Sequence, residues 1–400
     1  MARAIWLAGL LALALSACVE TRSPHMNGNG AGANPPDSMD RVLSRTFTVP
    51  AFKLESGQVL SELTLAYETY GRLAPDGRNA ILVTHGFTSS HHAAGKYAYT
   101  DATPGWWDGL IGPGKAIDTD RYFVVSSNML GSSYGSTAPA SKNPTTGKPY
   151  GPDFPDITLR DIVGAQKVLL EGLGVQHLVA VAGPSYGGYQ TFQWAVTYPT
   201  FMSGVVPVVS APKGSGGDAS VKALRDRFAT DPNWNGGWYY DRGGIFPTLL
   251  QLRIETLERY GQNEVLARTI TDPGERAARL RQLAEGWARQ FDPNSMIALR
   301  KAAVKFDAER DFSRVRAKVL YVLSRTDKLF PPSIAPEVMD RLGRAPRRRE
   351  VFRDRYRART LGERPRMGEV GSDLEGVHRG ARAVAQMRRP AGTRVRRIHI

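Results

Sequence analysis

A single serine in a glycine-rich turn constrains this chain more than any other feature. The apolar run 178–183 ends at Gly183-Pro184-Ser185-Tyr186-Gly187, and a helical pattern begins directly after it. In a strand-to-helix turn of the form G-x-S-x-G, small flanking residues allow the serine hydroxyl to be pushed outward. The N-terminus of the following helix adds a positive dipole beside it. The sequence therefore predicts Ser185 as a nucleophile, with a glycine turn holding an incidental serine as the alternative.

Apolar strands alternate with helical segments around this turn. Because buried strands separated by amphipathic helices favour a mostly parallel, doubly wound sheet, we expect an α/β fold. A helical block, 211–310, interrupts the pattern before the last strand and is expected to form a cap over the active site. The predicted strands are 80–86, 122–128, 178–183, 202–210 and 317–327, and the predicted helices beside them are 161–174 and 187–199.

Partners for the serine can be sought after the other strands. An oxyanion hole needs two backbone N–H groups, for which Tyr186 and Phe87 are the candidates. Asp327 follows a late strand, where its carboxylate could orient a histidine, although it could also only cap a helix. His85 is interpreted as a structural residue of its loop rather than a base. His91 and His92 lack a third ligand, so we expect no metal, and they are interpreted as rim or surface residues.

Several longer segments resemble the homoserine O-acetyltransferase family of the α/β-hydrolase fold. The resemblance runs from about 42 to 342 and rests on LAYETYG, DTDRYFVVSSNMLGS, DPNWNGG, FDPNSM and DKLFPP, among others. It implies an α/β-hydrolase domain over this range, an acyl-enzyme on Ser185 and Asp327 as the triad acid. It also implies that Arg225, six residues before the Asp-Pro of DPNWNGG, binds a substrate carboxylate. An ordinary surface arginine is the alternative.

Two departures from the family concern the site itself. The turn reads GPSYGGYQ where the family usually has GGSMGGMQ, so Pro184 and Tyr186 are expected to reshape the pocket. The family's histidine follows the acid by roughly 30 residues, in a Gly-His pair that this chain lacks. Only His378 and His399 remain as candidates, and they lie in an arginine-rich stretch, 343–400, without an apolar strand or an amphipathic helix.

We interpret this stretch as a reading in the wrong frame. After a shift of one base, Met367 and Gly368 must encode tryptophan, because ATG followed by G contains TGG. Residues 359–361 can then encode Gly-His, and the stretch from 353 onward can supply the missing strand and the last amphipathic helix. We refer to this product as the frame-restored chain. A genuine basic tail is the alternative, and the chain as written is expected to be catalytically impaired.

The same stretch accounts for most of the charge. The chain carries a formal net charge of +15, and residues 343–400 alone contain 17 arginines, no lysine and six acidic residues. Because no nucleic-acid-binding motif accompanies these arginines, a nucleic-acid partner is not expected. The expected partner is a small ester or thioester, without a cofactor, and a homodimer is left open.

The first 18 residues predict export. Arg3 precedes an apolar run that is too short to span a membrane, and the run ends in Leu-Ser-Ala-Cys. This pattern resembles a bacterial lipobox, so Cys18 is expected to carry a lipid anchor facing the periplasm or cell exterior. An ordinary cleaved signal is the alternative. Residues 19–41 are predicted to be a flexible tether.

The function predicted from the sequence is acyl transfer by a serine enzyme, a hydrolase or an acyltransferase. The alternatives are a true homoserine O-acetyltransferase that uses acetyl-CoA and a catalytically dead binding protein.

Overall fold

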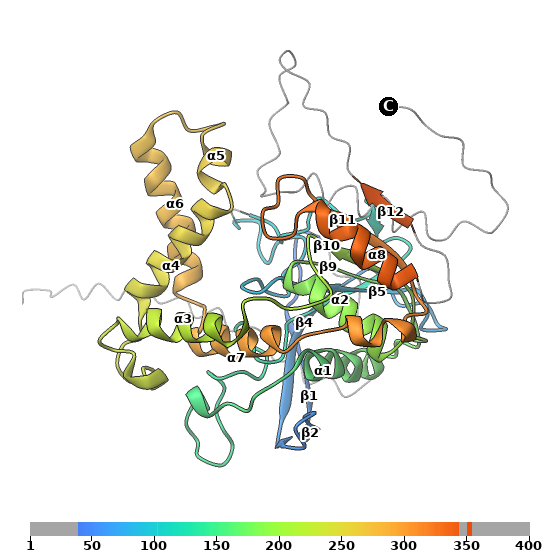
Figure 1. Cartoon of the computed structure of the whole chain (residues 1–400), viewed down its shortest axis with the longest axis horizontal. Coiled ribbons are helices and arrows are strands. Elements are labelled where there is room, and N and C mark those ends of the chain that lie inside the picture. Colours follow the sequence, from blue (N-terminus) through green and yellow to red (C-terminus); the bar gives the residue numbers. More distant parts are fainter. Residues whose placement is uncertain (1–38, 102, 344–349, 354–400) are drawn as a thin grey trace, which may run out of the picture.

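A single eight-stranded sheet forms the centre of the molecule (Figure 1). The computed structural model describes residues 39–101 and 103–343 and the backbone of 350–353. From β8 to β12 the six neighbouring strands run parallel, whereas β1 and β4 are antiparallel additions at one edge. In spatial order the strands are β1 (Arg45–Val49), β4 (Leu63–Tyr70), β8 (Phe123–Ser127), β5 (Ala80–Thr84), β9 (Leu178–Pro184), β10 (Met202–Val208), β11 (Lys318–Leu323) and β12 (Glu350–Arg353).

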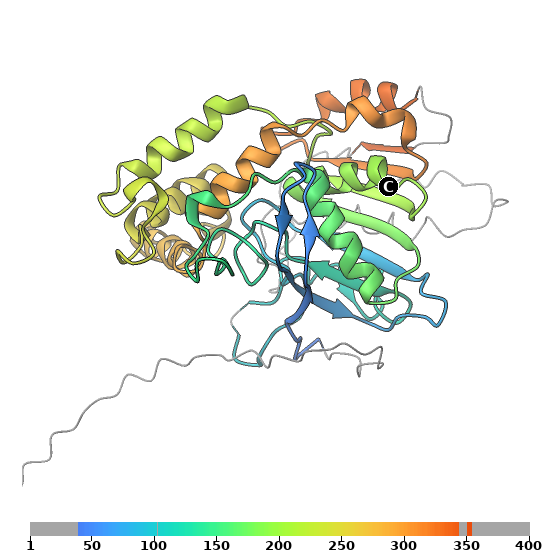
Figure 2. The ribbon, with the colours of Figure 1, turned by 90° about the horizontal axis from the view of Figure 1, so that it is seen from below.

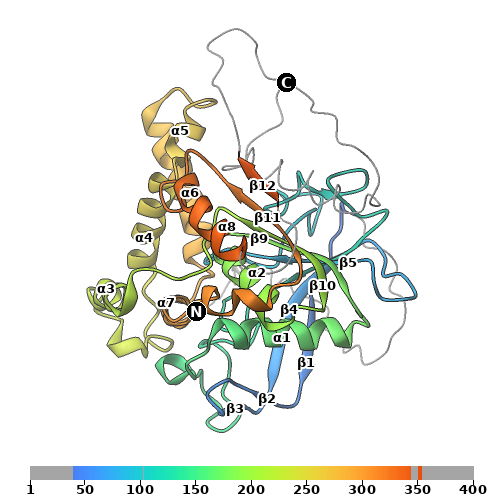
Figure 3. The same ribbon diagram turned by 45° about the vertical axis from the view of Figure 1, so that its right-hand side comes forward.

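The central strands are buried along almost their whole length, because both faces of the sheet are covered. One face carries α1 (Leu159–Gly172), α2 (Tyr186–Thr197) and α8 (Ala335–Gly343), which lie together over the strands in Figure 3. The opposite face is covered by residues 93–94 and 106–122, including the two-stranded pair β6 (Ile111–Gly112) and β7 (Ile117–Asp118). A second small pair joins β2 (Phe52–Lys53) and β3 (Val59–Leu60). This double covering explains the continuous apolar runs in the sequence.

A block of five helices lies between β10 and β11 in the chain and stands to one side of the sheet (Figure 2). It has its own core, built around Phe228, Trp234 and Trp287. Aspartates at 272 and 292 cap two of its helices by accepting hydrogen bonds from backbone N–H groups three residues on. The helices are α3 (Gly217–Ala229), α4 (Phe246–Arg259), α5 (Gln262–Leu266), α6 (Pro273–Ala288) and α7 (Pro293–Val304).

Short 3-10 helices complete the chain path at η1 (Gly151–Asp153), η2 (Asn235–Gly237), η3 (Glu309–Arg314) and η4 (Pro332–Ile334).

The two chain segments that enter and leave the helical block are joined to each other. Gly214 donates its N–H to the carbonyl of Phe306 at 2.9 Å, and Ala308 donates to Pro212 at 2.9 Å. Lys213 and Asp307 form the bridge between these bonds and also an ion pair at 3.4 Å. A side chain at Gly214 would place its Cβ 1.8 Å from the carbonyl oxygen of Ala303, so the crossing requires glycine. We call this pairing the neck of the helical block.

The strand β12 corrects the prediction that the stretch 343–400 contains no strand. Residues 350–353 pair in parallel with β11, from Leu320–Glu350 to Leu323–Arg353. The sequence pattern missed this strand because it is short and charged, and edge strands tolerate charged residues that central strands do not. Within the described part of the chain, no helix combines the length and apolar character needed to cross a membrane.

Candidate active site

Ser185 occupies the turn between the central strand β9 and the helix α2. Its backbone has a φ of 54° and a ψ of −119°, a conformation that costs free energy for any residue with a side chain. Its N–H donates to the carbonyl of Val208 at 2.9 Å, and its own carbonyl accepts from the Ser210 hydroxyl at 2.7 Å. These bonds fix the strained turn against β10. The half-buried Ser185 hydroxyl has no hydrogen-bond partner among the described residues.

Three glycines around the turn are required by close packing. A Cβ at Gly183 would lie 2.0 Å from the Thr84 hydroxyl oxygen, and one at Gly187 would lie 2.2 Å from the Thr84 carbonyl oxygen. At Gly188 a Cβ would lie 2.3 Å from the Cβ of Ser210. No side chain fits at such distances, because real Cβ atoms do not approach other heavy atoms below 3.0 Å. The turn therefore packs tightly against the end of β5 and the residues that follow β10.

Two backbone N–H groups near Ser185 have no acceptor among the described residues. Tyr186 is the first residue of α2, so its N–H has no partner within the helix. The N–H of Phe87, in the loop after β5, donates to no described residue either. The rings of Phe87 and Tyr186 stack at 5.7 Å, and a Cβ at Gly86 would lie 3.9 Å from that of Ser185, so this loop and the serine turn are neighbours. Both N–H groups could therefore donate to an oxyanion beside Ser185, and their role as an oxyanion hole stays a prediction.

Buried amides hold this loop in position. Gln190 of α2 donates to the carbonyl of His85 at 3.1 Å, and its side-chain oxygen accepts from Gln166 at 2.7 Å. Gln166 in turn accepts from the indole N–H of Trp194 at 2.7 Å. Because each side chain in this hydrogen-bond network has a partner, the network can hold the loop rigidly against α2.

His85 has both ring nitrogens bonded to the backbone. Nδ1 pairs with the carbonyl of Gly86 at 2.9 Å, and Nε2 accepts from the N–H of Met129 at 3.1 Å. The residue is fully buried, and this burial lowers its pKa to about 4. These bonds leave no lone pair for Ser185, in agreement with a structural role.

The buried His85 makes stability depend on pH. Its pKa is about 4 in the folded protein and 6.5 in a model peptide, so the unfolded chain binds more protons between these values. The free energy of unfolding is therefore expected to fall as the pH drops from 7 to 4, by about 3 kcal/mol at most from this group. Urea denaturation at several pH values gives the free energy of unfolding at each pH. This free energy should change less steeply with pH in His85→Asn than in the parent protein. Equal slopes in the two proteins would contradict the expectation.

Asp327 follows β11 at the carboxyl edge of the parallel strands, the edge at which β9 delivers Ser185. Its Oδ1 accepts the N–H groups of Leu329 at 2.7 Å and Phe330 at 2.8 Å. No described residue bonds Oδ2. The carboxylate thus caps the following turn with one oxygen, while no described residue bonds the other. Its geometry is compatible with a role as triad acid and with a role as a cap only.

No histidine in the described ranges bonds Ser185 or Asp327. His91 and His92 instead surround Glu68, a fully buried carboxylate of β4. His92 Nδ1 lies 3.2 Å from Glu68 Oε1, which also accepts from the Tyr97 hydroxyl at 2.7 Å. The described residues contain no group of three or more side chains suited to a metal ion. Cys18, His378, His399 and the shifted-frame stretch beyond 353 lie outside the described residues.

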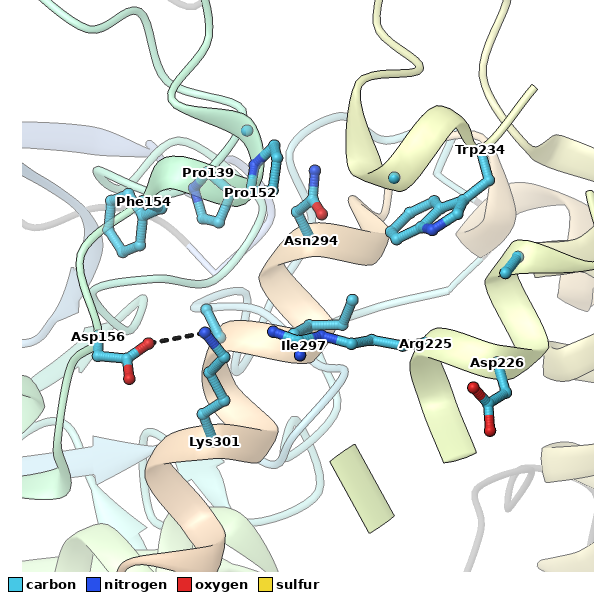
Figure 4. Close-up of a pocket in the computed structure, with 14 residues that line it drawn as sticks. Pro139, Pro152, Phe154, Asp156, Arg225, Asp226, Trp234, Asn294, Ile297 and Lys301 are labelled. Atoms are coloured by element: carbon cyan, nitrogen blue, oxygen red, sulfur yellow. Dashed lines mark hydrogen bonds and ion pairs between the residues drawn. The ribbon is translucent and has the colours of Figure 1, made fainter. Parts of the chain in front are cut away.

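Arg225 lies on α3 and lines a cavity of about 350 Å³ between α3, α7, η1 and η2 (Figure 4). The residues lining this cavity do not include Ser185, Phe87, Tyr186 or Asp327. The structure therefore places Arg225 in a pocket of its own, and its role in substrate binding stays a prediction.

A different arginine lies beside the loop of Phe87. Arg253 of α4 donates from Nη1 to the Thr88 hydroxyl at 3.3 Å, and its guanidinium lies 5.1 Å from the ring centre of Trp287. Trp287 donates its indole N–H to the carbonyl of Thr88 at 3.0 Å. The Nε of Arg253 is buried without an acceptor, and none of the ion pairs among the described residues includes this arginine. A half-buried cation whose Nε lacks an acceptor is stabilised when a ligand supplies an anion.

Arg253 was not among the residues predicted from the sequence, although a signal for it exists. The residue follows the buried Leu249 and Leu250 by four and three positions, which places it on the inward face of the helix.

Known proteins share both the fold and the sequence of this chain. The family model described as "alpha/beta hydrolase fold" matches residues 79–357. A homoserine O-acetyltransferase from Symbiobacterium thermophilum is 41% identical over 313 residues, which cover 72% of this chain and 81% of the relative. The chain belongs to the homoserine O-acetyltransferase-like family of α/β hydrolases.

Solved structures agree with this assignment. The homoserine O-acetyltransferase of Bacillus anthracis has a TM-score of 0.73 and 27% identity, covering 88% of this chain and 99% of the other. Esterase E22 has a TM-score of 0.74 and 31% identity, covering 86% and 99%. The predicted α/β-hydrolase fold is confirmed, as is the prediction of an acyl-transfer enzyme that resembles homoserine O-acetyltransferases.

Proposed function

We propose that this α/β hydrolase transfers an acyl group from an ester or thioester through Ser185. The Ser185 Oγ attacks the carbonyl carbon while a histidine takes its proton, and the carbonyl oxygen becomes an oxyanion held by the N–H groups of Phe87 and Tyr186. The carbon–oxygen or carbon–sulfur bond then breaks, and the leaving alcohol or thiol receives the proton. Water or a small alcohol attacks the acyl-enzyme and regenerates Ser185. Asp327 orients the histidine.

One observation carries this proposal: a strained serine lies beside two backbone N–H groups for which no described residue supplies an acceptor. A glycine-rich turn without a catalytic function would gain nothing from either feature, because the strain and the unpaired donors both cost stability.

The histidine is proposed to come from the frame-restored chain, at the Gly-His encoded by residues 359–361. It would follow Asp327 by roughly the family's spacing. No described residue bonds Oδ2 of Asp327, so this oxygen could accept a hydrogen bond from the histidine N–H. Sequencing the DNA across codons 335–400 tests this part directly. An unshifted sequence would leave His378 as the candidate worth mutating.

Arg253 is proposed to bind a carboxylate on the acyl acceptor or on the acyl group. It contacts Thr88, the residue next to Phe87, and it lacks an acidic partner among the described side chains. Guanidinium–carboxylate pairs combine charge with two parallel hydrogen bonds, which suits the recognition of an amino or hydroxy acid.

Replacing Arg253 by Gln is expected to change selectivity between two matched substrates. O-acetylhomoserine and its methyl ester differ only in the carboxylate, so the ratio of their kcat/KM values isolates this group. Because a hydrogen bond to a charged group contributes about 1.5–3 kcal/mol, the ratio should fall by about 10- to 150-fold in the frame-restored chain. Arg259→Gln, on the exposed end of the same helix, is the control and should keep the ratio. An unchanged ratio in Arg253→Gln would disprove the role.

Hydrolysis is favoured over transfer from acetyl-CoA. We propose that the protein is exported and held at a membrane by a lipid on Cys18, and acetyl-CoA is a cytosolic cofactor that such an enzyme would not meet. Hydrolysis of p-nitrophenyl acetate, measured with and without homoserine, separates the two. Formation of O-acetylhomoserine from acetyl-CoA at a higher rate than hydrolysis would favour the acetyltransferase. Membrane fractionation of the parent protein and of Cys18→Ala tests the lipid anchor, because only the parent should sediment with the membranes.

A homodimer also stays a prediction.

A binding protein without activity is the second candidate, favoured by the absence of a histidine bonded to Ser185 in the described ranges. A fluorophosphonate probe distinguishes the two, since only an activated serine reacts with it. Labelling of Ser185 in the frame-restored chain is expected. If that chain folds but stays unlabelled, the enzyme proposal fails.

A further inference from the structure

Exposed apolar side chains gather at the place where the described chain begins. Seven large apolar side chains among the described residues are exposed, and Leu43, Tyr97 and Tyr99 are three of them. Their exposed fractions are 38%, 43% and 79%. Single exposed apolar residues are ordinary on a protein surface, whereas a group of them in one place marks a site of interaction. We call these three residues the entry patch.

Backbone hydrogen bonds join the two segments that carry the entry patch. The N–H of Lys96 donates to the carbonyl of Met39 at 3.0 Å, and the N–H of Val42 donates to the carbonyl of Lys96 at 2.8 Å. The contact is close, because a Cβ at Gly95 would lie 2.5 Å from the Met39 carbonyl oxygen. The first described residues of the chain therefore lie directly beside the turn that carries the two tyrosines.

This turn is held in a fixed shape. Asp101 Oδ2 accepts the N–H groups of Tyr97 and Ala98, each at 2.9 Å. The Tyr97 ring stacks on His92 with 4.1 Å between the ring centres, and its hydroxyl donates to the buried carboxylate of Glu68 at 2.7 Å. A surface that is already ordered loses little conformational entropy when it binds a partner.

The chemistry of the entry patch suits a membrane surface. Tyrosine combines an apolar ring with a polar hydroxyl, and for this reason it is enriched where membranes meet water. Two cations, Arg41 and Lys96, and two acids, Asp40 and Asp101, lie in the same two segments. Because these charges balance, the burial of apolar surface is what draws the patch to lipid, and it does not require anionic headgroups.

The length of the chain before the patch decides which partner the patch meets. Residues 19–38 separate Cys18, the proposed site of the lipid, from Met39. A flexible tether of this length has a root-mean-square end-to-end distance of about 25 Å. A domain of about 300 residues is about 50 Å across. The face that contains Met39 therefore stays closest to the bilayer, and the rest of the domain lies beyond it.

We infer that the entry patch contacts the surface of the bilayer in which the lipid of Cys18 is inserted. The rings of Tyr97 and Tyr99 and the side chain of Leu43 lie among the lipid headgroups, and the domain keeps one orientation on the membrane. The inference rests on the proposed lipid anchor and adds a second contact to it, which strengthens the attachment. It does not depend on acyl transfer.

A fluorescent reporter beside the patch tests the inference in the full, lipidated chain. Cys18 is the only cysteine and carries the proposed lipid, so Thr100→Cys introduces the single free thiol. Thr100 is exposed and follows Tyr99 directly. The environment-sensitive dye NBD is attached to this thiol, and the protein is reconstituted into phosphatidylcholine vesicles. These vesicles carry no net charge, so they do not attract the arginines of residues 343–400.

NBD at position 100 is expected to emit at a shorter wavelength in vesicles than NBD attached through Asn263→Cys, an exposed position on α5. Leu43→Ser combined with Tyr99→Ser should remove this blue shift, because it removes most of the exposed apolar surface of the patch. The lipid should still sediment this variant with the vesicles.

Tyr260→Ser is the matched control, because it removes a tyrosine of 57% exposure from the end of α4, and it should keep the blue shift. Tyr97 is left unchanged in all variants, since its hydroxyl bonds Glu68. The replaced side chains are exposed, so the thermal unfolding midpoints should stay equal, which checks the fold.

The other outcomes overturn the inference in distinguishable ways. A protein that sediments with the vesicles while NBD at position 100 emits as in water keeps the anchor and disproves the contact. A blue shift that survives the loss of Leu43 and Tyr99 disproves the role of the patch. A blue shift that appears without vesicles at high protein concentration makes the patch an interface between copies of this chain. A protein that does not sediment has no anchor, and the inference then fails together with that proposal.

Discussion

The frame-restored chain is expected to hydrolyse p-nitrophenyl acetate at least about 10⁴-fold faster than the chain as written. A serine hydroxyl is a poor nucleophile until a base removes its proton, and no histidine in the described ranges bonds Ser185. The shifted frame supplies that base at a distance along the chain that the family leads us to expect. The measurement is the initial rate of p-nitrophenolate release by both purified proteins, together with their thermal unfolding midpoints.

Ser185→Ala in the frame-restored chain is the control, and it should return the rate to that of the chain as written. Equal rates of hydrolysis in the two chains would contradict the hypothesis of a lost histidine. If the chain as written is fast and His378→Ala makes it slow, the base lies in the arginine-rich stretch and the frame hypothesis is wrong.

The second large effect is expected from one methyl group at Gly187. In Gly187→Ala the new Cβ would lie 2.2 Å from the carbonyl oxygen of Thr84, a backbone atom that cannot rotate away. Either β5 or the serine turn must shift, which is expected to reduce the free energy of unfolding by about 3 kcal/mol. A shift of about 1 Å at a nucleophile can cost a hundredfold in rate. In the frame-restored chain, the rate at which a fluorophosphonate labels Ser185 should therefore fall by about that factor.

Gly286→Ala provides the matched comparison. This glycine lies inside α6 and has nothing within 4 Å of an added Cβ, so the same methyl group should stabilise the protein by about 0.5–1 kcal/mol. Urea denaturation of the two variants measures both effects. If Gly187→Ala is as stable as the parent and is labelled normally, the close packing around the turn does not matter as inferred.

The turn at Ser185 could be predicted because its determinants are local. An apolar strand, two glycines and a helix occupy adjacent positions in the sequence, and the structure places them as expected. Asp327 was placed at the end of a strand for the same reason. The parallel order of β9, β10 and β11 then brings both to one edge of the sheet, which follows from the topology of such folds.

The sequence could not show which of the two arginines lies near Ser185. Arg225 and Arg253 both lie on helices of the block between β10 and β11, and nothing in the sequence around them states which helix packs toward Ser185. That choice depends on long-range contacts, such as the one between Trp287 and Thr88, 199 residues apart. Burial of a charged group is equally hard to foresee, as Glu68 shows: strand alternation does not predict a carboxylate with zero exposure.

The neck between residues 212–214 and 306–308 has a consequence for how enzymes of this kind diversify. Because its two strands of chain are hydrogen-bonded to each other, everything between them leaves and rejoins the sheet at one point. An exchange of this segment between relatives would keep the serine turn, the loop of Phe87 and Asp327, and it would replace Arg225 and Arg253 together. Selection could therefore change what the enzyme recognises by recombination at two points of the gene that meet at one place in the fold.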